Sequence, residues 1–328
     1  MSFIRETRIE ANGLGFYLGE AGNPEQPLVL MLHGFPECWA SWRFQLPVLA
    51  ESGYYAVAPD LRGYGGTDAP EGVAAYSQRE LVRDVVALIE ALGHSEAVLV
   101  GHDFGSALAW QVARENPEKV RGLVALSVPY GGPAPEPPTE TMKRRFGDHF
   151  FYMLYFQQPE IPERELEADV GDSLRRIFHA LSGDADMNQV FGPRKGGGFL
   201  DTMPRPAEQP HWMREVDLDY YVSRFREHGF TGPLNWYRAL DLHWRQTRRD
   251  QHWQITPPTI FIAGRQDPVI ALNRKALERM PEYLDDHRGT WLLDDCGHWT
   301  QMEQPAQVTS LLMEFIETLE RDTAAASS

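Results

Sequence analysis

Short runs of apolar residues, each followed by a longer segment of helical periodicity, constrain the fold of this chain more than any other feature. Five such runs have the composition of buried strands, at 28–32, 55–58, 97–100, 123–126 and 259–262. Before the third run, Leu81, Val85, Leu88 and Leu92 share one helical face, and Gly93 follows as a stop signal. Consecutive parallel strands need a crossover connection, usually a helix. The alternation therefore predicts an α/β fold with a mostly parallel sheet flanked by helices.

The middle of the chain has a different pattern. Residues 133–138 include four prolines and are expected to form a linker, because proline at this density supports neither a helix nor a sheet ladder. From about 139 to about 252 the pattern is helical and aromatic, without a strand-like run. We therefore expect a core of residues 1–133 and 254–328, interrupted after its sixth strand by a mostly helical cap at 134–253.

The carboxyl-terminal segment predicts one further helix. Pro305 stands where a helix should begin, and an apolar stripe follows it at Val308, Leu311, Leu312, Phe315, Ile316 and Leu319. Residues 324–328 are expected to be a frayed tail.

Charge and cysteine content exclude several classes of protein. Lys and Arg number 31 against 47 Asp and Glu, and the resulting net charge of −16 disfavours nucleic-acid or anionic-membrane partners. Cys38 and Cys296 are the only cysteines, and no CxxC or HExxH spacing occurs, so we expect a reducing compartment, no metal and no cofactor. With neither a signal-peptide pattern nor an apolar run of eighteen residues, we expect a cytoplasmic protein without a membrane span.

One motif carries candidate chemistry. Gly101-His102-Asp103-Phe104-Gly105 lies between the apolar run at 97–100 and a helical segment that continues to about Glu115. This is the nucleophile elbow, Gly-x-nucleophile-x-Gly, with Asp103 in place of the more usual serine. The glycines permit a strained turn that exposes the nucleophile, and the helix N-terminus offers N–H groups to developing negative charge. The five-residue pattern alone is weak evidence, so its context decides.

The context supplies the partners that such a nucleophile needs. A His-Gly-Phe-Pro segment follows the first apolar run, so the backbone amides of Phe35 and Phe104 are the expected oxyanion-hole donors. Asp267 follows the strand-like run at 259–262, and His298 lies between the last strand and the last helix. The order nucleophile, acid, base is that of the α/β-hydrolase fold, with a mostly parallel eight-stranded sheet.

Several neighbouring residues permit other assignments. Asp294 and Asp295 lie close to His298 in sequence and are alternative candidates for the acid. For His33 and His102 we favour structural roles. The segment Arg62–Asp68 is expected to be a shaped loop beside the site.

An aspartate nucleophile limits the reaction. Attack on an acyl ester would give a mixed anhydride, whereas attack on a saturated carbon gives an alkyl ester of Asp103 that water can hydrolyse. His298 would activate that water and Asp267 would orient His298. The bond broken is then carbon–oxygen or carbon–halogen. An alkoxide leaving group needs a proton or strong hydrogen bonds, which tyrosines of the insertion could supply.

The motifs resemble those of the soluble epoxide hydrolases of the α/β-hydrolase fold superfamily. The resemblance covers nearly the whole chain and is strongest at residues 33–37, 101–103, 151–157, 232–238 and 297–302. It implies that Tyr152 and Tyr237 activate the epoxide oxygen, with Tyr155 as the fallback. Many relatives have Trp after the nucleophile. Phe104 departs from this, and the loss of an indole N–H weighs against halide binding.

The reaction predicted from these observations is hydrolysis of epoxides to vicinal diols. A haloalkane or haloacid dehalogenase and a non-catalytic small-molecule receptor are the alternatives. We expect a small apolar epoxide and water as partners, and a monomer or homodimer. The residues expected to line the substrate pocket are Phe35, Trp39, Trp236, Trp299 and Met302.

Overall fold

A computed structural model describes residues 3–185 and 196–326 of the chain. Within these residues, eight strands form one sheet in the order β1-β2-β4-β3-β5-β6-β7-β8. The first two strand pairs in this order are antiparallel and all the others are parallel. The strands are β1 (Arg5–Ala11), β2 (Leu14–Ala21), β3 (Leu28–Leu32), β4 (Tyr55–Pro59), β5 (Ala97–His102), β6 (Val120–Leu126), β7 (Thr259–Gly264) and β8 (His287–Leu293).

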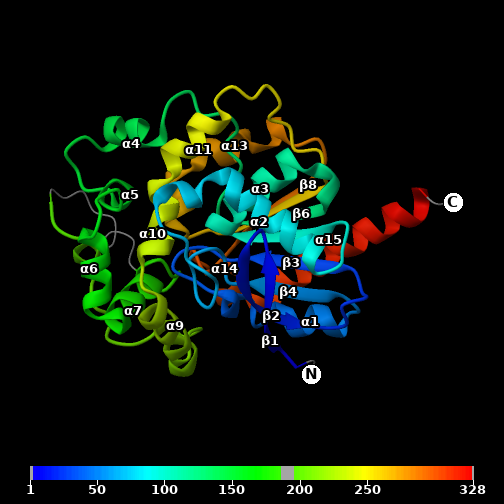
Figure 1. The fold of residues 1–328 in the computed structure, drawn as a ribbon, viewed down its shortest axis with the longest axis horizontal. Helices are drawn as coiled ribbons and strands as arrows, with labels where there is room; N and C mark the ends of the chain where they lie inside the picture. Colours follow the sequence, from blue (N-terminus) through cyan, green and yellow to red (C-terminus); the bar gives the residue numbers. More distant parts are fainter. Residues whose placement is uncertain (1–2, 186–195, 327–328) are drawn as a thin grey trace.

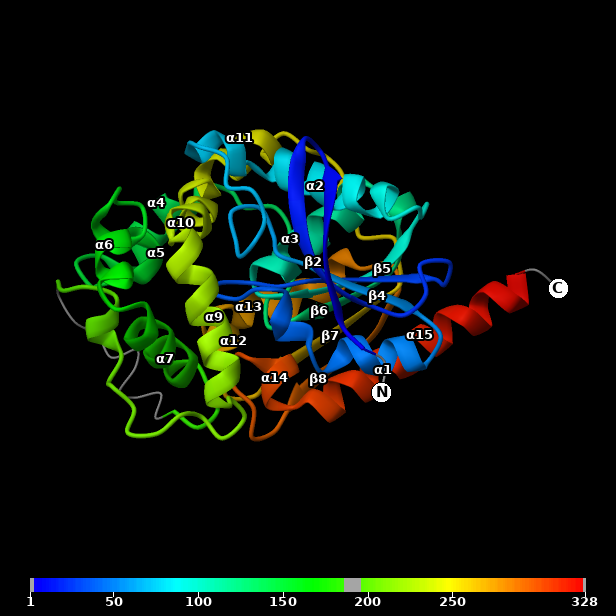
Figure 2. The same ribbon diagram turned by 60° about the horizontal axis from the view of Figure 1, so that its bottom comes forward.

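Helices cover both faces of this sheet. The central strands β3, β4, β5 and β7 are buried along their whole length, which requires cover on each side. The helices α2 (Gln78–Ala91) and α3 (Phe104–Glu115) pack on one face, and α1 (Gln45–Glu51) and α15 (Pro305–Ala326) pack on the other (Figures 1 and 2). The predicted α/β architecture and all five predicted strands are confirmed.

The predicted helices form for the expected reasons. In α2, Leu81, Val85 and Leu88 are buried, and Gly93 adopts a φ of 88° just beyond the helix end. The prediction of a frayed tail from residue 324 is wrong as far as residue 326, because α15 continues to Ala326. Alanine has the highest helix propensity of all residues, which favours this extension. The last two residues of the predicted tail lie outside the described residues.

The chain between β6 and β7 is helical, as predicted. Its described residues contain no strand and form α4 (Pro138–Phe146), α5 (Tyr152–Tyr155), α6 (Ile161–Ala168), α7 (Val170–Ala180), α9 (Glu215–His228), α10 (Thr231–Arg238) and α11 (Leu240–Thr247). Most of these helices lie together beyond one end of the sheet, on the left in Figures 1 and 2. The parallel strands end on this side, so the insertion covers the edge where their loops emerge.

The remaining helices that the structure describes are short, and all but one belong to the core part of the chain. They are α12 (Pro268–Leu272), α13 (Arg274–Arg279), α14 (Thr300–Glu303) and 3-10 turns at Trp39–Trp42, Val73–Tyr76, Pro117–Lys119, Leu200–Thr202 and Met280–Tyr283, of which Leu200–Thr202 alone belongs to the insertion. Among residues 3–185 and 196–326, no helix has both the length and the apolar character needed to cross a membrane.

Buried side-chain hydrogen bonds attach the insertion to the core. The Tyr220 hydroxyl of α9 accepts a hydrogen bond from Trp39 Nε1 at 2.7 Å, and the neighbouring Tyr221 hydroxyl lies 2.8 Å from Ser41 Oγ. In α10, Trp236 Nε1 donates to the carbonyl of Arg62 at 3.0 Å. Each of these bonds is buried or partly buried, so breaking one without replacing it leaves an unsatisfied polar group. The insertion is therefore held in a defined position over the sheet.

Candidate active site

Asp103 occupies a sharp turn between β5 and α3. Its backbone has φ 51° and ψ −117°, a region that non-glycine residues rarely adopt, as the elbow motif predicts. A Cβ on Gly105 would lie 2.1 Å from the carbonyl oxygen of Leu32, and one on Gly101 would lie 2.3 Å from that of Gly105. Both glycines are therefore needed for the close packing of strand, turn and helix that presents the Asp103 side chain.

One carboxylate oxygen of Asp103 already lies in the predicted oxyanion hole. The Phe35 backbone N–H donates to Asp103 Oδ1 at 2.9 Å. Phe104 is the first residue of α3, so its N–H lies at the helix N-terminus, where backbone donors have no partner within the helix. The structure thus places the Phe35 N–H on the Asp103 carboxylate and the Phe104 N–H at the start of the helix that follows Asp103.

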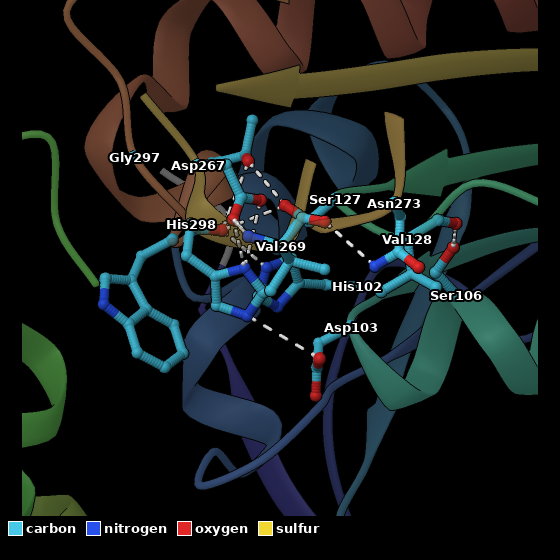
Figure 3. A network of polar contacts seen from close by, with 12 residues as sticks. His102, Asp103, Ser106, Ser127, Val128, Asp267, Val269, Asn273, Gly297 and His298 are labelled. Carbon is cyan, nitrogen blue, oxygen red and sulfur yellow. Dashed lines mark hydrogen bonds and ion pairs between the residues drawn. The ribbon is translucent and has the colours of Figure 1, made fainter. Parts of the chain in front are cut away.

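Figure 3 shows the His298 ring between two carboxylates, those of Asp267 and Asp103. The Nδ1 atom of His298 lies 3.1 Å from Oδ2 and 3.2 Å from Oδ1 of Asp267. Its Nε2 atom lies 3.7 Å from Oδ2 of Asp103. His298 and Asp267 are each 2% exposed, so solvent does not compete for their contact. The three side chains, from loops far apart in sequence, therefore have the arrangement of a nucleophile–base–acid triad.

The charges around His298 control its protonation. Burial by itself lowers the pKa of His298, but Asp267, and after it Asp103 and Glu37, outweigh this effect and raise the pKa to about 9. The protonated imidazole is thus the favoured form in the resting site at neutral pH.

The alternative acids do not contact His298. The Asp294 carboxylate accepts a hydrogen bond from Arg265 Nε at 2.6 Å and is exposed. Asp295 adopts a φ of 49° in the turn after β8, and its carbonyl accepts a hydrogen bond from Gln304. Asp267 is therefore the acid that the geometry favours.

The two predicted tyrosines come together above the nucleophile. Tyr152 begins α5 and Tyr237 lies in α10, and their ring centroids are 6.0 Å apart at an angle of 80°. Burial raises the pKa of both hydroxyls, and the negative charge of Asp103 raises each further. Both therefore stay protonated at neutral pH and remain able to donate. The fallback residue Tyr155 instead hydrogen-bonds Glu165, away from the cavity.

A mostly apolar cavity joins these groups. It has an empty volume of about 480 Å³, its open mouth included. It is lined by Phe35, Asp103, Tyr152, Ile177, Leu181, Phe199, Met203, Tyr237, Pro268, Val269, Leu272 and His298. Its polar groups are gathered at the catalytic end, so the rest of the cavity suits an apolar molecule.

Four of the five residues predicted to line the pocket do not line it. Phe35 does, but Trp39, Trp236, Trp299 and Met302 lie in the surrounding core. Each of the three indoles donates a hydrogen bond that holds it elsewhere, for Trp299 to the carbonyl of Phe178 at 2.8 Å. The other apolar walls come from the insertion (Ile177, Leu181, Phe199 and Met203) and from α12 (Pro268, Val269 and Leu272). No local sequence pattern distinguishes these residues from residues of the core.

Sequence reasoning missed a buried carboxylate behind the triad. Glu37 Oε2 accepts a hydrogen bond from the Gly34 N–H at 2.7 Å and lies 2.7 Å from His102 Nδ1. The other ring nitrogen of His102 lies 2.7 Å from the carbonyl oxygen of His298. Burial raises the pKa of Glu37, but His102, His33 and the Gly34 N–H together lower it to about 2. The signal available in the sequence was a glutamate directly after the His-Gly-Phe-Pro segment.

His33 and His102 are both buried and hydrogen-bonded through both ring nitrogens, which fits the structural roles expected for them. Burial lowers the pKa of His33 to about 4, although Glu37 and the Gly34 carbonyl raise it. The neutral ring accepts a hydrogen bond from the Leu61 N–H at Nε2 and donates to the Gly34 carbonyl from Nδ1. His33 therefore links the oxyanion loop to the loop after β4.

Within the described parts of the chain, no group of three or more His, Cys, Asp or Glu side chains could hold a metal ion. The polar groups around the cavity are a carboxylate, an imidazole, backbone amides and two phenols. These groups suit nucleophilic attack followed by base-assisted hydrolysis.

Known proteins are similar to this chain in sequence and in fold. Residues 27–305 match the family model described as alpha/beta hydrolase fold. Epoxide hydrolase A of Mycobacterium tuberculosis is 41% identical over 96% of this chain and 98% of its own length. The bifunctional epoxide hydrolase 2 of Sus scrofa is 36% identical over 89% of this chain, which spans about half (52%) of that longer protein.

Solved structures agree with these relatives. The crystal structure of epoxide hydrolase A from Mycobacterium thermoresistibile has a TM-score of 0.91 and 39% identity, and covers 96% of this chain and 98% of its own. An epoxide hydrolase from an endophytic Streptomyces has a TM-score of 0.92 and 37% identity, with 97% and 96% covered. The chain therefore belongs to the soluble epoxide hydrolase family of the α/β-hydrolase fold.

Proposed function

We propose that this protein hydrolyses epoxides to vicinal diols through an alkyl ester on Asp103. The observation that carries the proposal is one cavity in which Asp103 and His298 face Tyr152 and Tyr237. A carboxylate on one side and two protonated phenols on the other suit a ring that must be attacked at carbon and protonated at oxygen.

In the first step, a carboxylate oxygen of Asp103 attacks a ring carbon of the epoxide. Oδ1 is already bound by the Phe35 N–H, which leaves Oδ2 as the attacking atom. The carbon–oxygen bond of the ring breaks, and its electron pair stays on the epoxide oxygen. The hydroxyls of Tyr152 and Tyr237 stabilise that oxygen and supply its proton, which returns later from solvent.

In the second step, water hydrolyses the ester. His298 Nε2 removes a proton from a water molecule, and the resulting hydroxide adds to the carboxyl carbon of Asp103. The N–H groups of Phe35 and Phe104 stabilise the negative charge that forms on Oδ1. Collapse of this intermediate breaks the bond between the carboxyl carbon and the diol oxygen, and that oxygen takes the proton held by the His298 imidazolium, which Asp267 has stabilised. The new carboxyl group of Asp103 then loses its proton to solvent, which restores the carboxylate.

Dehalogenation on the same fold is the second candidate, and the site favours it less. A halide leaves as a stable anion and needs N–H donors. The residue after the nucleophile is Phe104, which has no side-chain donor, and the Trp236 indole donates to the Arg62 carbonyl. Two phenols above the nucleophile serve an oxygen leaving group better.

The proposal also covers the insertion and the cellular location. Residues 134–253 act as a cap that supplies the tyrosines and encloses a small apolar epoxide. Both cysteines are buried and form no disulfide, as expected in a reducing compartment, and this supports a cytoplasmic location.

The origin of the new diol oxygen tests the mechanism. In a single turnover with excess enzyme in ¹⁸O water, we expect the diol to take its new oxygen from Asp103 and the label to enter the enzyme. Mass spectrometry of the Asp103 peptide and of the diol measures both, with Asp103→Ala as the inactive control. Label in the diol formed in that single first turnover would rule out the ester. Faster release of halide than formation of diol would favour the dehalogenase.

A further inference from the structure

The loop that carries His298 is held by a buried carboxylate outside the triad. Glu303, at the end of α14, is 7% exposed. Its Oε1 accepts a hydrogen bond from the Trp299 N–H at 2.9 Å, and its Oε2 accepts one from the Gly297 N–H at 2.9 Å. The residues directly before and after His298 are thus bound to the two oxygens of one side chain.

The same carboxylate also binds the insertion. Oε2 of Glu303 accepts a hydrogen bond from the Gly183 N–H at 2.8 Å and a longer one from Ser182 Oγ at 3.4 Å. Both donors lie just after α7, and Ile177 of α7 and Leu181 directly after the helix belong to the cavity wall. Glu303 therefore joins the base loop to a wall of the substrate cavity.

Backbone contacts close this junction. The N–H of His298 donates to the carbonyl of Leu181 at 2.8 Å. A Cβ on Gly297 would lie 2.3 Å from the Gly183 nitrogen, so the two segments are in direct backbone contact. In such a packed junction, moving one segment moves the other.

We propose that Glu303 is a positioning residue for the hydrolytic half-reaction, holding His298 against the cavity wall so that its imidazole meets the ester of Asp103. The inference rests on the proposed function. The nucleophile, the oxyanion amide of Phe35 and the tyrosines are attached elsewhere, so loosening the junction should affect ring opening less than hydrolysis.

Two variants of the junction and one control test this. Glu303→Gln keeps the length and shape of the side chain but replaces one carboxylate oxygen by an NH2 group, which cannot accept a hydrogen bond from the backbone N–H that it faces. Glu303→Asp keeps charge and both acceptors but is one methylene shorter, so it cannot reach donors on both sides of His298 and on the insertion together. It provides a milder change if the first variant folds poorly. Glu314→Gln, on the exposed side of α15, removes the same charge away from the junction.

Single-turnover kinetics separate the two steps. Since small misplacements of a catalytic group can cost a hundredfold, we expect Glu303→Gln to slow ester hydrolysis roughly 10- to 100-fold. Ring opening should change less than about threefold, so kcat and KM fall together and kcat/KM is nearly kept. The ester should accumulate in intact-mass spectra. Glu303→Asp should show the same pattern more weakly, and Glu314→Gln should match wild type.

A purely structural role gives a different result. If Glu303 only stabilises the fold, the variants lower the melting temperature while the ratio of the two rate constants stays at the wild-type value, and the proposal is overturned. An equal loss in both steps also overturns it. Failure of the proposed function is distinct, because wild type and His298→Gln would then form no ester at all.

Discussion

The Nε2 atom of His298 lies 3.7 Å from Oδ2 of Asp103, too far for a strong hydrogen bond but close enough for a strong charge interaction. The negative charge of Asp103 is one of the effects that raise the pKa of His298 to about 9. Once Asp103 carries an alkyl group it is neutral, and this effect disappears. In the proposed mechanism, ring opening therefore makes His298 more readily deprotonated before the step in which it acts as a base.

This relationship predicts a difference between two titrations. In the free enzyme, ¹⁵N NMR should give a midpoint near 9 for His298. The rate constant for ester hydrolysis, measured by stopped flow, should rise with pH and level off with a midpoint below 9, because only the neutral imidazole accepts a proton. Equal midpoints, or hydrolysis that slows as pH rises from neutral, would contradict the mechanism.

The same pKa predicts how stability depends on pH. The folded-state pKa of about 9 is above the ordinary value of 6.5, so protonated His298 stabilises the fold fully below pH 6.5. This contribution, at most about 3 kcal/mol, is lost as pH rises through 9. Urea unfolding at pH 6 and pH 9.5 measures it. His298→Gln should lose less stability over this range than wild type; equal losses would exclude His298 as the source.

Removing the base should trap the intermediate. His298→Gln retains Asp103 and both tyrosines, so we expect ring opening without hydrolysis. Intact-mass measurement should then show the enzyme plus one substrate. Normal turnover, or a variant that never acquires the adduct, would mean that His298 is not the base.

The two tyrosines should share the activation of the epoxide oxygen. Removing one hydroxyl should slow ring opening by about 10²–10⁴-fold, the usual range for a positioned acid, or about 3–5 kcal/mol. The surviving hydroxyl can still donate after either single change, so the losses should not be additive. The Tyr152→Phe/Tyr237→Phe double variant should be far slower than either single variant, as measured by single-turnover ring opening.

Hydrolysis provides the internal control for the tyrosine variants. An ester that has already formed on Asp103 depends on His298 and the Phe35 N–H, so its hydrolysis should suffer much less. Circular dichroism checks that each variant is folded. Ring opening by the double variant at nearly the wild-type rate would show that the tyrosines do not activate the epoxide.

The cavity walls predict where substitutions alter binding. Leu272 lines the cavity, so Leu272→Trp should narrow it and raise KM for bulky epoxides. Trp39 lies outside the cavity and donates to the Tyr220 hydroxyl, so Trp39→Phe should lower stability by about 1 kcal/mol and leave KM unchanged. Steady-state kinetics and thermal unfolding of both variants measure this contrast. A higher KM in Trp39→Phe alone would place that side chain at the substrate.

Most of the fold could be predicted because its strands are buried on both faces. β5 and β7 are continuous apolar runs, which a sequence shows directly. The hairpin of β1 and β2 has mixed burial, and no prediction placed its strands. The prediction of a frayed tail was wrong, because the alanines after the apolar stripe favour a helix and α15 continues through them to Ala326.

The site could be predicted where a residue of catalytic type directly follows a predicted strand. Asp103, Asp267 and His298 each follow a strand and lie at the same edge of the sheet. The pocket walls and Glu303 were not predictable in this way. Whether a tryptophan side chain lines a cavity or packs in the core depends on where its indole N–H finds an acceptor. That acceptor is set by tertiary contacts, which a local sequence pattern does not show.

The insertion lies between β6, which ends at Leu126, and β7, which begins at Thr259, and these two strands pair side by side. Closing a long excursion between adjacent strands is entropically inexpensive, since each doubling of its length costs only about 0.6 kcal/mol. Asp103, His298 and Asp267 all belong to the core. A change in the length of the insertion therefore costs little chain entropy, so the cavity can be reshaped as long as Tyr152 and Tyr237 and the buried hydrogen bonds to the core are kept.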